Sequence, residues 1–323
     1  MANVTLVSGF LLKGFSEVLE LQVLHGVLFL VIYLTALMCN FLIITLITLD
    51  LELHTAMYFF LKNLSSFDVF LVSVPIPKFI VSSLTHNYSI SFLGCAFQLL
   101  LITSFSAGET FVLTAMSYDR YVAICYPLHY GFIMNNNTCM LMASASWVIG
   151  ALFGGLYTAV TFSMSFCGLH VIPQFFCDIP SLLRVSCSET QAVVYASLGI
   201  GMCLGVSCFI CITVSYIYIF STVLKIPTTK GQSKAFSTCL PHLTVFTVFI
   251  ITACFVYLKP SSNTPSVIDN LLSVLYTVLP PILNPVIYSL RNKDMKQALK
   301  RLLLKKGEII LRNHLSLKTQ VLL

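Results

Sequence analysis

The chain has 323 residues, of which 57% are hydrophobic and only 9% are charged, and its mean hydropathy is +0.91. Soluble domains carry roughly 25% charged residues, so this composition excludes a soluble globular protein and indicates a chain that crosses a membrane several times. The net charge of +6 does not indicate nucleic-acid binding, because the basic residues do not gather into one folded patch with stacking aromatic residues.

The N-terminal segment does not look like a cleavable signal peptide. Its first 24 residues contain Lys13, Glu17 and Glu20, without a basic start followed by a small-residue cleavage site. We therefore expect the first apolar segment to insert as its own signal anchor.

Seven segments are long and apolar enough to cross a bilayer, which takes roughly 20 helical residues. They are residues 25–49, 57–80, 95–121, 141–162, 193–222, 236–258 and 268–289. Prolines 75 and 77 in the second segment, and 280, 281 and 285 in the seventh, predict kinks that neighbouring helices can accommodate. The pattern predicts an all-α membrane protein, a single domain whose seven-transmembrane helix bundle occupies residues 25–289.

The basic residues are distributed unequally between the two sides of such a bundle. Of the 18 Lys and Arg residues, 14 lie on the side of the C-terminus and 4 on the side of the N-terminus. Because basic residues favour the cytoplasmic side, we expect residues 1–24 outside the cell and residues 290–323 in the cytoplasm. Asn3, in the sequon Asn3-Val4-Thr5, is then expected to be glycosylated, whereas the pattern at Asn87 leaves modification open.

A helical pattern returns after the seventh span. Its apolar positions, flanked by basic residues, are Met295, Ala298, Leu299, Leu302 and Leu303. This spacing predicts a short amphipathic eighth helix on the inner membrane surface, with an unstructured basic tail as the alternative.

Topology sorts the 12 cysteines into two groups. Eight fall in spans or cytoplasmic loops, where we expect reduced thiols. Cys95, Cys167, Cys177 and Cys187 fall outside, in an oxidising compartment. Four cysteines allow three pairings, and their spacing does not choose among them.

Asp68 and Glu109 are the only acidic residues well inside the predicted spans, and Asn40 and Asn284 are further polar residues at mid-span. Ionisable residues are costly in hydrocarbon, so both acids are candidates for function and need polar partners inside the bundle. Two neighbouring carboxyl groups that share a proton are the simpler alternative to an ion site.

Asp119-Arg120-Tyr121 places an acid beside a base where the third span ends. Alone, this triplet is typical of an interfacial anchor. The whole run MSYDRYVAICYPLHY at residues 116–130, however, closely resembles the end of the third helix of olfactory receptors, which are rhodopsin-like (class A) G-protein-coupled receptors. The other blocks that resemble this family lie at residues 53–61, 175–183, 234–243 and 284–288. Together they cover the chain from about residue 10 to 305, in the family's order.

The resemblance implies an odorant receptor of the plasma membrane rather than an enzyme. Such a receptor binds small volatile molecules and activates a stimulatory olfactory-type heterotrimeric G protein, which raises cyclic AMP. In the family, the arginine that Arg120 matches is the switch residue, and Tyr216 matches a tyrosine that swings toward it. The matched switch positions are Asp119, Arg120, Tyr121, Tyr216, His242, Asn284, Pro285 and Tyr288. His242 is equally compatible with a purely packing role.

The resemblance also implies two further features. Asp68, Glu109 and Asn284 match positions that face one another below the ligand pocket, and they form a candidate sodium site with no other cofactor expected. The likeness of residues 175–183 to the second extracellular loop pairs Cys95 with Cys177 and Cys167 with Cys187.

The candidate ligand pocket begins with a hydroxyl-bearing face of the third span at Thr103, Ser106, Ala107 and Thr110. By analogy with the family, its other members are Ile200, Cys203, Leu204, Ile250, Ala253, Tyr257, Val274 and Thr277. An apolar lining with a few hydroxyls and no charge suits small neutral molecules. The chain departs from the family at Ala56, where relatives carry Pro, and at residues 249–251, where many carry Phe-Tyr-Gly.

Three other functions compete with this one. A receptor of the same family for a ligand that is not an odour is compatible with all of these residues. A transporter or channel is less favoured, because only two buried acids are visible. An intramembrane enzyme is disfavoured, because the spans lack His-Glu-x-x-His, Gly-x-Ser-x-Gly and paired catalytic aspartates. The expected partners are an odorant, a G protein and membrane lipid.

Overall fold

The computed structural model describes residues 9–16, 18–166, 171–187, 191–258, 267–291 and 294–304. For residues 249–250, 252–258, 267–273 and several single positions it describes the backbone alone.

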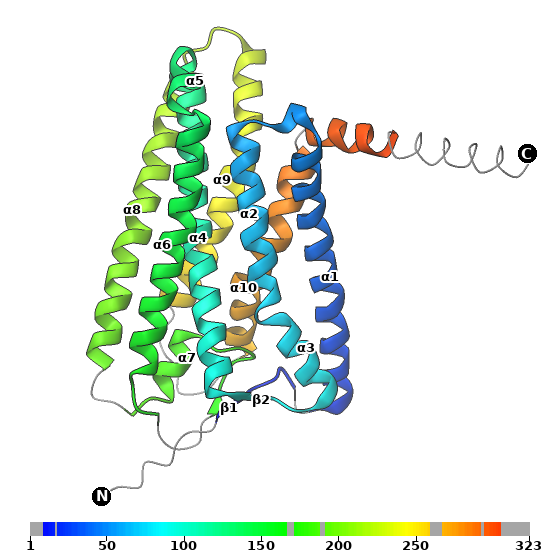
Figure 1. The fold of residues 1–323 in the computed structure, drawn as a ribbon, viewed down its shortest axis with the longest axis vertical. Helices are drawn as coiled ribbons and strands as arrows, with labels where there is room; N and C mark the ends of the chain where they lie inside the picture. Colours follow the sequence, from blue (N-terminus) through cyan, green and yellow to red (C-terminus); the bar gives the residue numbers. More distant parts are fainter. Residues whose placement is uncertain are drawn as a thin grey trace, which may run out of the picture.

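In the described part of the chain, seven long helical segments form an elongated bundle (Figure 1). They are α1 (Leu19–Leu49), α2 (Ala56–Ser73) continued by α3 (Ile76–Thr85), α4 (Phe92–Cys125), α6 (Asn136–Phe162), α8 (Gln191–Val223), α9 (Thr229–Leu258) and α10 (Val267–Arg291). Each covers one predicted span, and within the described residues the first five are long and apolar enough to cross a membrane. Most extend beyond the predicted ends, because helical hydrogen bonding continues into the headgroup region, where hydropathy has already fallen.

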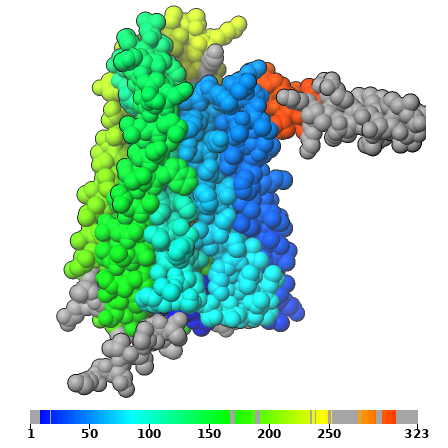
Figure 2. Space-filling model, in the orientation of Figure 1, coloured from blue at the N-terminus to red at the C-terminus, as the bar shows by residue number. Residues whose placement is uncertain are grey.

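The fourth helix, α4, is the centre of the packing. It lies against α2, α6 and α8, and its contact with α6 depends on glycines. A Cβ atom at Gly150 would lie 2.5 Å from the Ser104 carbonyl oxygen, and one at Gly154 would lie 2.5 Å from the Leu100 carbonyl oxygen. Small residues allow such close backbone approach between membrane helices. Figure 2 shows how closely the side chains of α1, α2 and α6 pack over one face of the bundle.

The predicted prolines interrupt or bend two helices. Pro75 lies between α2 and α3, so the second span is two helices in series. In α10, Pro285 has no N–H group, so it leaves the carbonyl of Pro281, one turn earlier, without its helical donor. The Asn40 side chain of α1 donates to that carbonyl at 2.9 Å and to the Ala36 carbonyl at 3.0 Å. The donor that Pro285 removes from α10 is therefore supplied by α1.

A small sheet that the sequence did not predict caps one end of the bundle, which we call the sheet end. Its strands β1 (Gly9–Leu12), β2 (Ser89–Ser91) and β3 (Val171–Ile172) lie in the order β2-β1-β3. Strand β1 pairs antiparallel with β2 and parallel with β3. A short helix, α7 (Ile179–Arg184), follows β3.

The opposite end, the Arg120 end, carries the short elements η1 (Leu51–Leu53), η2 (Pro127–His129) and α5 (Tyr130–Ile133). Residues 294–304 form the predicted eighth helix, which runs sideways from the bundle (Figure 1). Met295 and Ala298 are buried, Leu299 and Leu302 pack on the core, and Leu303 is exposed. Arg301 fastens this helix to the first loop through ion pairs with Asp50 and Glu52, at 2.7 Å each. The amphipathic helix is therefore confirmed.

Replacing Asn40 with Leu should lower the free energy of unfolding by about 1–3 kcal/mol, because it leaves the buried Pro281 carbonyl oxygen without a donor. Thermal unfolding of the purified protein in detergent measures the change. Thr48→Val is the control, since the exposed Thr48 hydroxyl donates to the Ile44 carbonyl of its own helix. Equal melting temperatures for the two variants would contradict the assigned role of Asn40.

Candidate functional site

Three polar side chains meet in the middle of the bundle. Asn284 of α10 donates through Nδ2 to both carboxylate oxygens of Asp68 in α2, each at 3.1 Å. The same nitrogen lies 3.1 Å from Glu109 Oε1 of α4. All three side chains are buried, with at most 2% of their surface exposed. The structure thus brings together the three residues predicted to form the sodium site.

This cluster has more acceptor oxygens than donors. One amide nitrogen serves three carboxylate oxygens, and Asn284 Oδ1 is buried without a hydrogen-bond partner among the described residues. Two carboxylates this close in a buried site cannot both ionise without a proton or a cation between them. The carboxyl groups of Asp68 and Glu109 supply oxygens of the type that hard cations prefer, and three of these oxygens lie 3.1 Å from the same atom, Asn284 Nδ2. The donor set therefore fits a small cation.

Arg120 lies at the end of α4 in an ion pair with its neighbour. One guanidinium nitrogen of Arg120 is 3.2 Å from Asp119 Oδ2. The other oxygen of Asp119 accepts a hydrogen bond from the Tyr130 hydroxyl of α5 at 2.8 Å. Asp119 is fully buried, so Tyr130 and Arg120 both compensate for its loss of hydration. Sequence reasoning missed Tyr130, because no spacing rule connects a loop tyrosine to an acid eleven residues before it.

A second buried contact joins three helices near Arg120. His242 Nε2 of α9 lies 2.9 Å from the Leu113 carbonyl oxygen of α4, and since a carbonyl can only accept, this nitrogen carries the proton. In the neutral ring Nδ1 is then an acceptor, and the Tyr216 hydroxyl of α8 donates to it at 2.8 Å. Tyr216 is thereby held by His242. His242 does more than fill space, because it bonds to both α4 and α8.

Tyr288 completes the set of switch candidates at this end. It is 2% exposed and packs in the same core cluster as Leu113 and Met116 of α4. Its hydroxyl is buried without a hydrogen-bond partner among the described residues. A buried hydroxyl without a hydrogen bond costs free energy. A second helix packing in which the Tyr288 hydroxyl gains a partner would therefore be favoured by that hydrogen bond.

The predicted pocket residues divide into four groups, one for each helix that carries them. Those of α4 are partly buried, and the Thr103 and Thr110 hydroxyls donate to carbonyls one turn earlier in their own helix. In α8, Ile200, Cys203 and Leu204 are exposed, whereas the buried face passes through Cys208, Ile212 and Tyr216. Val274 is partly buried and Thr277 is buried. The side chains of Ile250, Ala253 and Tyr257 lie outside the described part of the chain.

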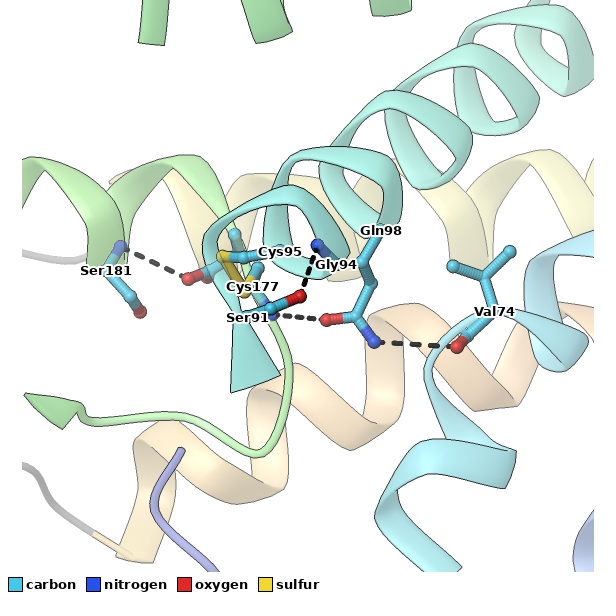
Figure 3. Close-up of a disulfide and its surroundings, with 8 residues drawn as sticks. Val74, Ser91, Gly94, Cys95, Gln98, Cys177 and Ser181 are labelled. Atoms are coloured by element: carbon cyan, nitrogen blue, oxygen red, sulfur yellow. Dashed lines mark hydrogen bonds between the residues drawn. A yellow bond between two sulfur atoms is a disulfide. The ribbon is translucent and has the colours of Figure 1, made fainter. Parts of the chain in front are cut away.

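At the sheet end, a disulfide ties the loop before α7 to the start of α4 (Figure 3). It joins Cys95 to Cys177, the pairing that the resemblance implied. Gln98, one turn further along α4, accepts a hydrogen bond from the Cys177 backbone N–H at 2.8 Å and donates to the Val74 carbonyl at 3.4 Å (Figure 3). Gln98 of α4 thus connects the loop at Cys177 to Val74, between α2 and α3. Sequence reasoning missed this role.

The second predicted pair is only partly visible. Cys187 is disulfide-bonded, and the neighbouring residues Phe166 and Ser186 form an antiparallel bridge. Cys167, its predicted partner, lies outside the described residues, as does the predicted glycosylation site Asn3. Asn87 is exposed, and its side-chain oxygen accepts from Ser89.

Asp178, next to the disulfide, caps α7 by accepting the Ser181 backbone N–H at 3.1 Å. Burial raises the pKa of this carboxyl group to about 6, and the Ser181 hydrogen bonds and the charge of Arg184 oppose the shift only in part. The Asp178 carboxyl group at the sheet end therefore changes its charge near pH 6.

The comparison with solved structures shows the fold. The fold is similar to that of squid rhodopsin, with a TM-score of 0.71 and 16% sequence identity over 88% of this chain and 81% of that one. The architecture is thus the seven-helix fold of rhodopsin-like receptors, and the candidate site lies between its helices.

The sequence comparisons define the family. The olfactory receptor family model matches residues 29–306. Human olfactory receptor 14A2 is 77% identical over 94% of this chain and 97% of its own length, and human olfactory receptor 14A16 is 54% identical over 96% and 99%. The chain belongs to the olfactory receptor family, and it is a multi-pass membrane receptor rather than an enzyme.

Thermal unfolding should depend on pH through Asp178. Its folded pKa of about 6 exceeds the unfolded value of about 3.9, so the folded state binds the proton more tightly. The resulting stabilisation is present at low pH and is lost as pH rises through 6, by an amount on the order of 1–3 kcal/mol. Asp178→Asn keeps a capping oxygen but cannot titrate. The melting temperature of the wild type, relative to this variant, should fall between pH 5 and pH 7.5; a constant difference would contradict the assignment.

Proposed function

We propose that the protein is an odorant receptor that binds small, mostly apolar volatile molecules within the helix bundle and activates a stimulatory olfactory-type heterotrimeric G protein, raising cyclic AMP. The observation that carries the proposal is the continuous likeness to olfactory receptors along nearly the whole chain. The half-buried hydroxyl face of α4, in the outer half of the bundle, is the proposed centre of the ligand site.

The proposed orientation places the sheet end outside the cell and the Arg120 end in the cytoplasm of a plasma-membrane protein. Three observations support it. The basic residues favour the C-terminal side. The Cys95–Cys177 disulfide belongs to an oxidising compartment. Strand β1 and the helix at 294–304 lie at opposite ends of the bundle (Figure 1).

In the proposed mechanism, the described arrangement is the resting one. Asp119, which accepts a hydrogen bond from Tyr130, pairs with Arg120, and His242 accepts a hydrogen bond from the Tyr216 hydroxyl. A ligand that fits a second packing better shifts the population toward that packing. There Tyr216 leaves His242 and turns toward Arg120, and a cleft opens between Arg120, Tyr216 and Tyr288 for the G protein.

A sodium ion at Asp68, Glu109 and Asn284 would favour the resting packing. The bound ion supplies positive charge that neutralises the two carboxylates. The chain's own contribution is to hold oxygens from α2, α4 and α10 around one point, so that ion binding and helix packing become coupled. A turn of the Asn284 amide would bring its unpartnered Oδ1 toward the ion as a neutral ligand.

Sodium should stabilise the purified receptor. Replacing choline chloride by sodium chloride at constant ionic strength should raise the melting temperature by a few degrees, because only the folded state gathers the three ligands. Asp68→Asn should abolish this rise, whereas Asp50→Asn, at an acid bound to Arg301, should retain it. A rise of the same size in all three proteins would mean that the salt acts elsewhere.

Arg120→Ala should abolish the cyclic AMP response to an odorant found by screening volatile molecules, while delivery to the cell surface stays near that of the wild type. The loss is expected because the guanidinium is the proposed contact of the open cleft. Lys230→Ala removes an exposed basic residue at the start of α9 and is the matched control for charge. Full signalling by Arg120→Ala, measured at equal surface levels, would refute the mechanism.

A further inference from the structure

The N-terminal strand β1 holds two otherwise separate loops together. Its register places Phe10 opposite Ile90 of β2 and Leu11 beside Val171 of β3. Beyond the strand, the Lys13 backbone N–H lies 3.0 Å from both the Ile172 and the Gln174 carbonyl oxygens. Because β3 is an edge strand of this sheet, it loses its sheet partner if β1 leaves.

The side chains of β1 are alternately buried and exposed. Phe10 and Leu12 are each 3% exposed and belong to the cluster that contains the Cys95–Cys177 disulfide. The Phe10 ring meets the Phe166 ring edge-on at 5.3 Å. Leu11, between the two, is 49% exposed. Strand β1 is therefore fixed by one face only, and its other face offers a matched control position.

A second anchor lies three residues past the strand. The centroid of the Phe15 ring is 5.1 Å from that of Phe79 in α3 and 5.3 Å from that of Phe175, which follows β3. Phe175 in turn packs against Phe29 of α1 and Phe79. Aromatic pairs in such edge and tilted arrangements each contribute beyond their buried area. Residues 9–15 thus contact the loop at residues 171–176 twice, through the pairing of β1 with β3 and through the ring of Phe15.

We propose that residues 9–15 form a latch that holds the loop at residues 171–176 over the sheet end of the bundle and thereby controls passage between water and the α4 face at Thr103. Phe10 and Phe15 are the positioning residues of this latch. The inference rests on the proposed ligand face, since a latch matters to function only if the ligand site lies beneath it. Its test requires neither a ligand nor a G protein, so it can fail while the proposed function stands.

The test measures how fast a thiol beneath the latch reacts with a reagent that cannot cross membranes. Thr103→Cys places the thiol on α4 about three helical turns from Phe92, where the helix begins. Intact cells are treated with a methanethiosulfonate reagent that carries a quaternary trimethylammonium group, and labelling is counted per receptor at the surface. The chain without the substitution gives the background from its native cysteines. Phe10→Asp and Phe15→Asp each break one anchor, and Leu11→Asp adds the same charge on the exposed face.

Labelling of Cys at position 103 should be slow in the otherwise native chain and faster, by on the order of tenfold or more, with either broken anchor, because loss of a buried aromatic group favours local opening. Leu11→Asp should leave the rate unchanged. Fast labelling in the otherwise native chain would overturn the proposal, since nothing would then be covered. Slow labelling in all variants would overturn the role of Phe10 and Phe15, and equal acceleration by Leu11→Asp would replace the latch with a general effect of charge.

A variant that does not reach the surface is replaced by Phe10→Ala or Phe15→Ala, which opens a cavity without burying a charge. A second measurement uses the backbone. A Cβ atom at Gly9 would lie 2.5 Å from the Ile90 carbonyl oxygen, so Gly9→Val cannot keep the β1–β2 pairing. It should accelerate labelling as the anchor variants do, and an unchanged rate would count against the latch.

Discussion

The bundle depends on the side-chain amide of Asn284, which donates hydrogen bonds to two buried acids. Asn284 stands between Asp68 and Glu109, so three helices that are distant in sequence meet at a point where any ionised group needs compensation. Hydrocarbon offers no alternative partner, so the three side chains must either stay together or exchange partners together. This constraint makes a concerted change of packing more favourable than the independent movement of one helix.

The other polar contacts arrange the ends of the helices around that point. Asn40 supplies the donor that Pro285 removes from α10, which lets α10 bend while its backbone remains satisfied. His242 bonds to both α4 and α8 and thereby fixes the position of the Tyr216 hydroxyl. At the sheet end, the disulfide, Gln98 and β1 fix the loop above α4. The two ends differ, since a covalent disulfide helps to hold the sheet end, whereas hydrogen bonds and ion pairs hold the Arg120 end.

Much of this could be predicted from the sequence, because the strongest signals are local. Apolar length alone located the seven spans, and the neighbours Asp119 and Arg120 could only pair with each other or with groups nearby. The resemblance supplied the disulfide pairing and the meeting of Asp68, Glu109 and Asn284. Strand β1 was missed because four mostly apolar residues before a span carry no alternation that distinguishes a strand. The partners of His242 and Asn40 depend on how distant helices turn toward one another, which no spacing records.

The central claim is that binding near α4 changes the packing at Arg120. Its most direct test is the distance between spin labels placed by unnatural amino acids at the exposed positions Asn137 in α6 and Lys230 in α9, measured by pulsed electron resonance with and without an activating odorant. The account predicts a second, longer distance between the labels, whose population grows with odorant concentration. In the Tyr216→Phe variant, the same odorant concentration should produce a smaller population of the longer distance. A single distance distribution that the odorant does not alter, in a receptor that signals normally, would contradict it.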